Sequence, residues 1–259
     1  MHTMRITIIG SGNVATHLAA AFKNAGHAIV QVYSRDLQNA SLPAYHVKAE
    51  AIDNLAQINP ETDLFLIAIK DDAIEQIAAE LTKYDKLIVH TSGATSLQIL
   101  QKYTQNVGVF YPLQTFSKTR ELNFNTVPLC IEGADEKITS TLNELAFTIS
   151  QNVYRVNSDQ RKTLHLAAVF ANNFPNYLYH VSQQLLAEKQ LPFDLLRPLI
   201  LETAEKVQEH LPADVQTGPA VRNDGETMAS HLEQLQKNPD LQEIYKLLSQ
   251  GIIKMENRG

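Results

Sequence analysis

The sequence contains a single cysteine, Cys130, so no disulfide bond can form within the chain and no cluster of cysteines can hold a metal ion. Its nine histidines are scattered along the chain. The spacings His-x-x-x-His and His-Glu-x-x-His, which place two imidazoles on one face of a helix, do not occur. We therefore expect no metal site.

Long apolar runs and an excess of positive charge are also missing. No apolar run approaches the roughly 18–20 residues needed to cross a bilayer, and the formal net charge is -6. These properties favour neither a membrane protein nor a partner of nucleic acid. A signal peptide is not expected, because the chain enters a predicted strand at Arg5–Ile9. The composition indicates a cytoplasmic protein.

The first part of the chain alternates short β-rich runs with helical patterns, which is typical of βαβ units and a parallel sheet. Helical spacing of apolar residues covers 14–25, 73–81 and 96–103. Several of the predicted strands are apolar on both faces, as strands between two layers of helices should be. They are Arg5–Ile9, Ile29–Tyr33, Leu64–Ile69, Leu87–Val89, Val107–Phe110 and Val127–Ile131.

Long helical patterns dominate the second part and cover 158–189, 193–210, 225–236 and 241–255. We predict two domains. Residues 1–153 form an α/β domain with a doubly wound, mainly parallel sheet, and residues 154–259 form an all-α domain. In the first long helical pattern we expect a buried core made of Leu164, Leu166, Val169 and Phe170.

A glycine-rich motif, Gly-x-Gly-x-x-Ala, links the first predicted strand to the first predicted helix. Gly10 allows a tight turn, Gly12 lets the backbone approach a pyrophosphate, and Ala15 permits close packing of helix and strand. The helix N-terminus offers free N–H groups to the phosphates. In this context the motif predicts a Rossmann domain. The expected cofactor contacts in the motif are Gly10, Ser11, Gly12, Asn13 and Val14.

The end of the second predicted strand discriminates between NAD and NADP. NAD-binding domains usually have an acid there, which bonds the ribose 2′-OH, whereas NADP-binding domains accommodate the 2′-phosphate with arginine. Ser34 and Arg35 occupy the place of the acid, and a guanidinium suits a phosphate. Asp36, one position later, keeps NAD as the alternative. We predict NADP.

Polar segments follow three other predicted strands, at residues 68–72, 90–93 and 111–116. Ligands of open α/β sheets bind beyond the carboxyl ends of the strands. We therefore expect Ile69, Ser92 and Pro112 to flank the cofactor. Alternatively, these segments only cap helices and turn the chain.

In the helical part, Lys162, His165 and Asn172 are spaced so that they share one face of a helix. His165 or Lys162 is the candidate proton donor. Asn172 and Arg222 are candidates to orient the substrate, since a guanidinium can hold a carboxylate with two hydrogen bonds. The plainer alternatives are a packed histidine, a solvated lysine and an ion pair between Arg222 and Asp224.

Six motifs carry a resemblance to known proteins: Gly10–Ala15, Asp71–Asp72, His90–Gly93, Pro112–Phe116, Ala168–Phe174 and Thr217–Asp224. The chain resembles reductases that join a Rossmann domain to a helical C-terminal domain, namely pyrroline-5-carboxylate reductase, ketopantoate reductase and the coenzyme-F420-dependent NADP oxidoreductases. It is most similar to Rossmann-like proteins whose second domain is a domain of unknown function. The resemblance implies NADP-linked reduction and a helical domain that often forms dimers. Tyr111 departs from the family pattern, which has a histidine there. This departure weakens a catalytic role for the segment 111–116.

We therefore expect an NADP-dependent reductase that delivers hydride to a small carbonyl or imine, such as a 2-keto acid like ketopantoate. The alternative is a non-enzymatic NADP-binding sensor or partner protein. We expect the active site in a cleft between the two domains, where His165, Asn172 and Arg222 face the nicotinamide. We also expect a homodimer through the helical domain. Candidates for its interface are Phe170, Phe174 and Tyr177–Val181.

Overall fold

The structure is a computed structural model that describes residues 3–117, 120 and 122–256. The chain divides into two compact units, Met1–Tyr177 and Leu178–Gly259. The first unit contains an eight-stranded sheet with helices, and the second is built from helices. The predicted fold class, a Rossmann domain followed by an all-α region, is confirmed. The domain boundary after residue 153 stays a prediction.

The sheet has the strand order β3-β2-β1-β4-β5-β6-β7-β8. Its neighbouring strands pair in parallel except for β6 and β7. The strands are β1 Arg5–Ile9, β2 Ala28–Tyr33, β3 Glu50–Ile52, β4 Leu64–Ile67, β5 Leu87–His90, β6 Val107–Pro112, β7 Leu129–Gly133 and β8 Val153–Arg155. Successive strands run outward in one direction from β1 to β3 and in the other direction from β4. The reversal between β1 and β4 marks the crevice in which sheets of this kind bind ligands.

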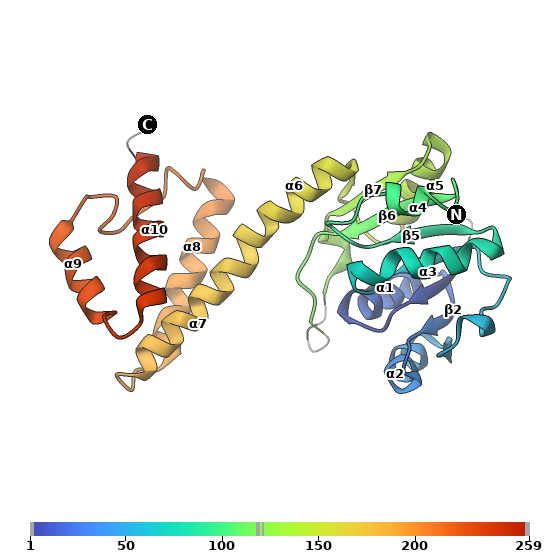
Figure 1. The fold of residues 1–259 in the computed structure, drawn as a ribbon, viewed down its shortest axis with the longest axis horizontal. Coiled ribbons are helices and arrows are strands. Elements are labelled where there is room, and N and C mark those ends of the chain that lie inside the picture. Colours follow the sequence, from blue (N-terminus) through green and yellow to red (C-terminus); the bar gives the residue numbers. More distant parts are fainter. Residues whose placement is uncertain (1–2, 118–119, 121, 257–259) are drawn as a thin grey trace. The chain divides into compact units, whose positions relative to one another are not determined.

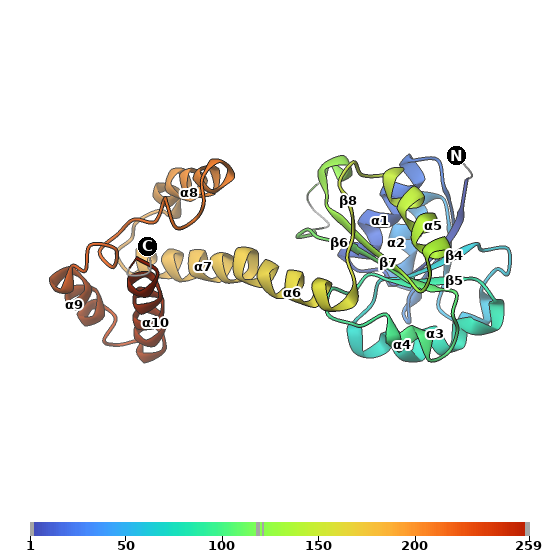
Figure 2. The same ribbon diagram turned by 90° about the horizontal axis from the view of Figure 1, so that it is seen from above.

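Helices cover both faces of the sheet (Figures 1 and 2). One face packs against α1 Asn13–Asn24, α2 Leu37–Val47 and α5 Glu136–Phe147, and the other packs against α3 Ile74–Leu81 and α4 Gln98–Gln101. Along β4, Leu64 and Leu66 join the first core while Phe65 and Ile67 join the second. Because strand side chains alternate between faces, a strand buried on both sides is apolar at every position.

Among the α-helices and strands of the sheet unit, four were not predicted: α2, β3, α5 and β8. The two strands are three residues each, too short for a periodic signal. Helix α2 carries Pro43 in its interior, which argues against a helix, but the side chain of Asp36 caps its N-terminus by accepting from Gln38 N. Helix α5 begins in the same way, with Asp135 accepting from the backbone of Ile138.

A long helical segment follows β8, as predicted. It consists of α6 Ser158–Ala168, a π-helical turn Val169–Asn173 and α7 Phe174–Ala187. The π turn ends just before Pro175, which has no N–H to continue the regular hydrogen-bond ladder. The prediction that Leu166 and Phe170 are buried in the core is wrong, because they are 58% and 63% exposed. The apolar pattern is present, but within the first unit the described residues leave Leu166 and Phe170 largely uncovered.

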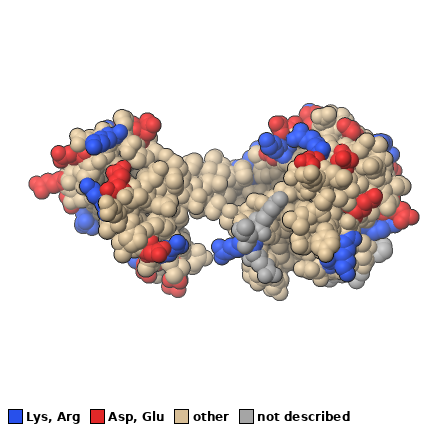
Figure 3. Space-filling view, turned by 90° about the horizontal axis from the view of Figure 1, so that it is seen from below, with Lys and Arg blue, Asp and Glu red and all other residues tan. Residues whose placement is uncertain are grey.

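The second unit contains α8 Arg197–Glu209, α9 Gly225–Gln234 and α10 Pro239–Glu256, close to the predicted ranges. Asp224 caps α9 by accepting hydrogen bonds from the backbone and hydroxyl of Thr227. On the face shown in Figure 3, Lys and Arg are mixed with Asp and Glu rather than gathered by sign. None of the helices in the described part of the chain has both the length and the apolar character needed to cross a membrane.

Candidate active site

The turn after β1 depends on Gly10. This residue has a φ of 124°, a conformation that residues with a side chain rarely adopt. A Cβ atom at Gly10 would lie 2.2 Å from the carbonyl oxygen of Ala68, at the end of β4. The backbones of the two central strands therefore approach each other closely at the point where the sheet order reverses.

Gly12 has a different environment. Its φ of -74° is open to any residue, and a Cβ atom there would meet nothing within 4 Å. Gly12 is also the N-cap of α1, whose first N–H groups have no side-chain cap. Open space above a bare helix N-terminus is what a pyrophosphate requires, because the N–H groups and the helix dipole both attract negative charge. The turn therefore fits a dinucleotide.

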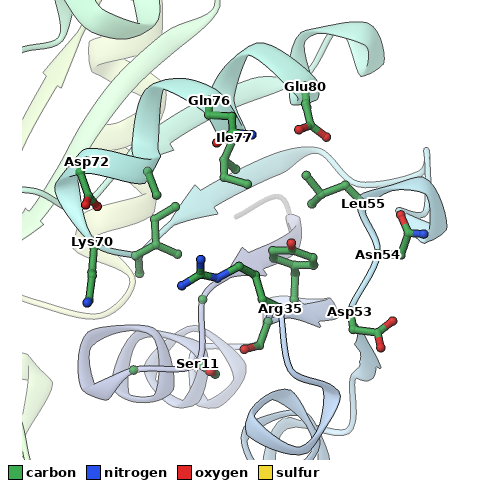
Figure 4. A pocket seen from close by; sticks show the side chains of 17 residues that line it. Ser11, Arg35, Asp53, Asn54, Leu55, Lys70, Asp72, Gln76, Ile77 and Glu80 are labelled. Atoms are coloured by element: carbon green, nitrogen blue, oxygen red, sulfur yellow. The ribbon is translucent and has the colours of Figure 1, made fainter.

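A cavity of about 1270 Å³ opens beside this turn. The predicted residues Gly10, Ser11, Gly12, Ser34, Arg35 and Ile69 all line it. Arg35 is exposed and forms no ion pair with any described residue. In Figure 4 its guanidinium extends into the cavity toward the side that carries Lys70. Lys70 is a second cation that we did not single out in the sequence. The cavity thus presents two cations, Arg35 and Lys70, and three carboxylates, Asp53, Asp72 and Glu80.

Asp36, the residue that kept NAD as an alternative, is occupied elsewhere. One of its carboxylate oxygens accepts from Gln38 N at 2.9 Å and the other from the Asn39 side chain at 3.3 Å. Both bonds stabilise the start of α2. Asp36 does not line the cavity, whereas Ser34 and Arg35 do.

A second cavity, of about 360 Å³, continues the crevice on the other side of the turn. Gly12, Ala68 and Ile69 line both cavities. The remaining predicted residues of the sheet unit meet here, together with one residue of α6: Asn13, Val14, Ser92, Pro112 and His165. The crevice therefore runs from the cavity that Arg35 lines to an end that contains His165.

His165 contacts Tyr111 at this end. The Tyr111 hydroxyl lies 3.1 Å from His165 Nδ1, and the two rings meet edge to face. The imidazole also lies against Gly93, where a Cβ atom would be 2.6 Å from Nδ1. Burial raises the pKa of Tyr111 to about 12, so the phenol keeps its proton at neutral pH. Tyr111, whose segment the sequence analysis gave only a weakened catalytic role, thus contributes a hydroxyl group from β6 beside the candidate histidine.

His90 is not available to a substrate, although it is the last residue of β5, a strand in the middle of the sheet. It is fully buried, and its Nδ1 accepts from Ser92 N. Burial, together with the charge of Arg161, lowers the pKa of His90 to about 3. The ring is therefore neutral at physiological pH and serves to shape the loop that carries Ser92.

Arg161 is fully buried and was not predicted as important. Its guanidinium forms an ion pair with Glu132 on β7 and donates to the carbonyl oxygens of Ser92 and Thr95. Glu132 also accepts from the backbone and hydroxyl of Ser158. These bonds fix the first turn of α6 to the sheet and to the loop after β5. His165 lies one helical turn beyond Arg161, on the same face.

The other candidate residues lie outside the two cavities. Lys162 is half exposed and sits 3.8 Å from Asp159, and Asn172 is exposed. Arg222 is an exposed residue of the second unit. It forms no ion pair with Asp224 within the described residues, and the Asp224 carboxylate caps α9.

Comparisons with known proteins agree with this architecture. Residues 1–114 match the family described as Rossmann-like domain, and residues 127–252 match the domain of unknown function DUF2520. The chain is 42% identical to a candidate NADP oxidoreductase from Bacteroides fragilis, with a TM-score of 0.93 over 97% of this chain and 98% of that chain.

Two more distant structures share the fold. A protein from Thermotoga maritima is 20% identical, with a TM-score of 0.75 and 98% of both chains covered. The imine reductase from Myxococcus stipitatus in complex with NADP+ is 14% identical, with a TM-score of 0.67 over 98% of this chain and 93% of that chain. No curated protein matches significantly. The chain belongs to the family of proteins in which a Rossmann-like domain is followed by a DUF2520 domain.

Proposed function

We propose that the protein is an NADP-dependent oxidoreductase that reduces a small carbonyl or imine compound. The observation that carries the proposal is the crevice that runs from the open turn at Gly12 to the pair formed by Tyr111 and His165. A phosphate cradle at one end and two proton-bearing side chains at the other suit a cofactor-dependent reduction. The 42% identical protein from Bacteroides fragilis, a candidate NADP oxidoreductase, supports the same reaction class.

NADP is favoured over NAD by the place of Arg35, whose guanidinium extends into the cavity toward the Lys70 side, and not by the net charge of the lining, which also includes Asp53, Asp72 and Glu80. Arg35 and Lys70 line that cavity, and cations there stabilise the 2′-phosphate that distinguishes NADP. Asp36, the nearest acid after β2, is engaged at the N-terminus of α2. Titration calorimetry with NADPH and NADH tests this preference directly, and equal affinities would contradict it.

The bound nicotinamide supplies the hydride, and the protein binds and activates the acceptor. In this proposal His165 donates an N–H to the oxygen or nitrogen atom of the acceptor, which stabilises the charge that develops there. Lys162 remains the alternative donor. Asn172 and Arg222 remain proposed substrate-orienting residues, and closure of the helical region over the crevice is part of the same hypothesis.

An imine suits the described end of the crevice better than a 2-keto acid does. Among the described residues that line it, none is Lys or Arg, and Asp71 is the one carboxylate. A neutral imine accepts the His165 N–H at its nitrogen lone pair and becomes a cation as the proton moves onto it, and an acidic side chain stabilises that cation. A 2-keto acid instead carries a carboxylate that needs a cation. A 2-keto acid would therefore depend on Arg222.

The experiment that tests the function is NADPH oxidation by the purified protein against a panel of cyclic imines and 2-keto acids. We expect turnover with imines to exceed turnover with keto acids of similar size. Tight NADPH binding without oxidation in the presence of any acceptor would instead support a non-enzymatic NADP sensor.

A homodimer is also part of the proposal. Residues 163–187 contain no Asp, Glu, Lys or Arg, yet Leu166, Phe170, Phe174 and Tyr177 are exposed in the single chain. An uncharged helical surface of this kind is typical of an interface between subunits.

A further inference from the structure

Tyr111 and His165 come from different layers of the fold. Tyr111 lies near the end of β6, and its ring belongs to the core on the α3 side of the sheet. His165 lies on α6. Their side chains meet at the end of the crevice, with 3.1 Å between the Tyr111 hydroxyl oxygen and His165 Nδ1. Neither residue can reach the other unless α6 is docked on the sheet in one particular way.

Two features enforce that docking. The guanidinium of Arg161 joins the first turn of α6 to Glu132 and to the loop after β5. Gly93, in that same loop, leaves just enough space for the imidazole, since a Cβ atom would stand 2.6 Å from Nδ1 and 2.8 Å from Cγ. The Nδ1 side of the ring is therefore enclosed by Gly93 and Tyr111.

We propose that Tyr111 is a positioning residue, whose hydroxyl donates to Nδ1 of His165 and thereby keeps the proton of the neutral imidazole on Nε2. A neutral imidazole carries a proton on one nitrogen, and the other nitrogen accepts. The described residues give the Tyr111 hydroxyl no other hydrogen-bond partner. If Nδ1 carried the proton instead, the phenol proton would lack an acceptor in the protein, which is costly for a largely buried group.

The phenol is suited to this task in both states of the ring. Burial keeps its pKa near 12, so it has a proton to donate at neutral pH. Its oxygen can also accept from Nδ1–H when the imidazole is protonated, and the phenol proton then has no acceptor among the described residues. In either state the Nε2–H is the donor left for the acceptor molecule. This inference rests on the proposed function for its catalytic meaning, but the ring geometry can be measured without any substrate.

The test uses nitrogen-15 NMR of the histidine side chains in the full chain, with His165→Gln to assign the signals. We expect neutral His165 to be protonated at Nε2, and its Nδ1 signal to move in Tyr111→Phe as the accepted hydrogen bond is lost. The matched control is Tyr103→Phe, which removes a hydroxyl bonded to Glu75 outside both cavities. Protonation at Nδ1 in the parent protein, or an unchanged signal in Tyr111→Phe, would overturn the proposal.

A second readout is kinetic. With the best acceptor from the panel, Tyr111→Phe should lower kcat about tenfold or more while the Kd for NADPH stays within about twofold. Tyr103→Phe should leave both constants unchanged. An unchanged kcat in Tyr111→Phe would overturn the positioning role. If no acceptor is reduced at all, the proposed function fails, and the NMR result still decides the inference.

Discussion

Gly10 and Gly12 lie in one turn, but they matter for different reasons. The backbone conformation of the turn requires glycine at Gly10, whereas the proposed pyrophosphate requires the open space at Gly12. At Gly10 an added Cβ would collide with the backbone of Ala68, and the positive φ adds strain. At Gly12 an added side chain would enter empty space. The same chemical change should therefore affect stability at one position and binding at the other.

We predict that Gly12→Val abolishes NADPH binding while the thermal unfolding temperature stays close to that of the parent. The valine side chain would occupy the space that the pyrophosphate needs. Gly10→Ala serves as the contrast and should lower the unfolding temperature by several degrees, because strain of this kind costs about 1–3 kcal/mol. Titration calorimetry and thermal unfolding separate the two effects. Unchanged NADPH affinity in a folded Gly12→Val protein would show that the phosphates lie elsewhere.

Charge reversal at Arg35 should discriminate between the two cofactors. We expect Arg35→Glu to weaken NADPH binding by roughly 10–150-fold, since a hydrogen bond to a charged group is worth about 1.5–3 kcal/mol, and to change NADH binding much less. Lys137→Glu makes the same charge change on α5, away from both cavities. Equal losses for both cofactors in calorimetry would argue against a contact with the 2′-phosphate.

At the scale of elements, the ion pair between Arg161 and Glu132 anchors α6 to the sheet. Arg161 is fully buried and the Glu132 side chain is 17% exposed. A buried charge that loses its partner is expensive, typically about 3–5 kcal/mol. We predict that Glu132→Gln lowers the free energy of unfolding by about 3 kcal/mol or more. The mutation should also weaken the contact between Tyr111 and His165.

Urea unfolding measures this effect, and the sequence offers a matched control. Glu136→Gln removes the same charge from a glutamate that pairs with Arg155 at the surface, where both side chains are more than half exposed. A surface pair contributes about 0–1 kcal/mol, so little change is expected. Similar losses in the two variants would show that the buried pair does not anchor α6.

Local patterns account for what the sequence predicted. The strand β1, its glycine turn and α1 follow one another directly, so the phosphate cradle could be identified without knowing the fold. Ser34 and Arg35 were identified for the same reason. Helix α2 was missed because Pro43 lies in its interior and because its capping residue, Asp36, could equally be assigned to a ribose contact.

Contacts between distant residues could not be predicted in the same way. His165 was selected on helical spacing alone, and its partner Tyr111 was discounted because it departs from a family pattern. The pairing depends on how α6 docks, and that docking depends on Arg161, Glu132 and Gly93 meeting from three separate segments. The periodicity of apolar residues in the sequence does not predict contacts between such distant segments. The exposure of Leu166 and Phe170 was also hidden, because an apolar helix face looks the same whether its own chain or another one covers it.

At the scale of the whole molecule, the uncharged helical segment leads to the last prediction. A stretch without charged residues that exposes several aromatic rings is poorly suited to face water alone. Light scattering at micromolar concentration should therefore report the mass of two chains. Phe170→Glu should shift the protein toward the monomer, because a carboxylate buried in an apolar interface costs several kcal/mol. Leu42→Glu is the matched control, since Leu42 on α2 and Phe170 are both 63% exposed. A monomeric parent protein, or a Phe170→Glu variant as dimeric as the control, would mean that this surface does not bind a second copy of the chain.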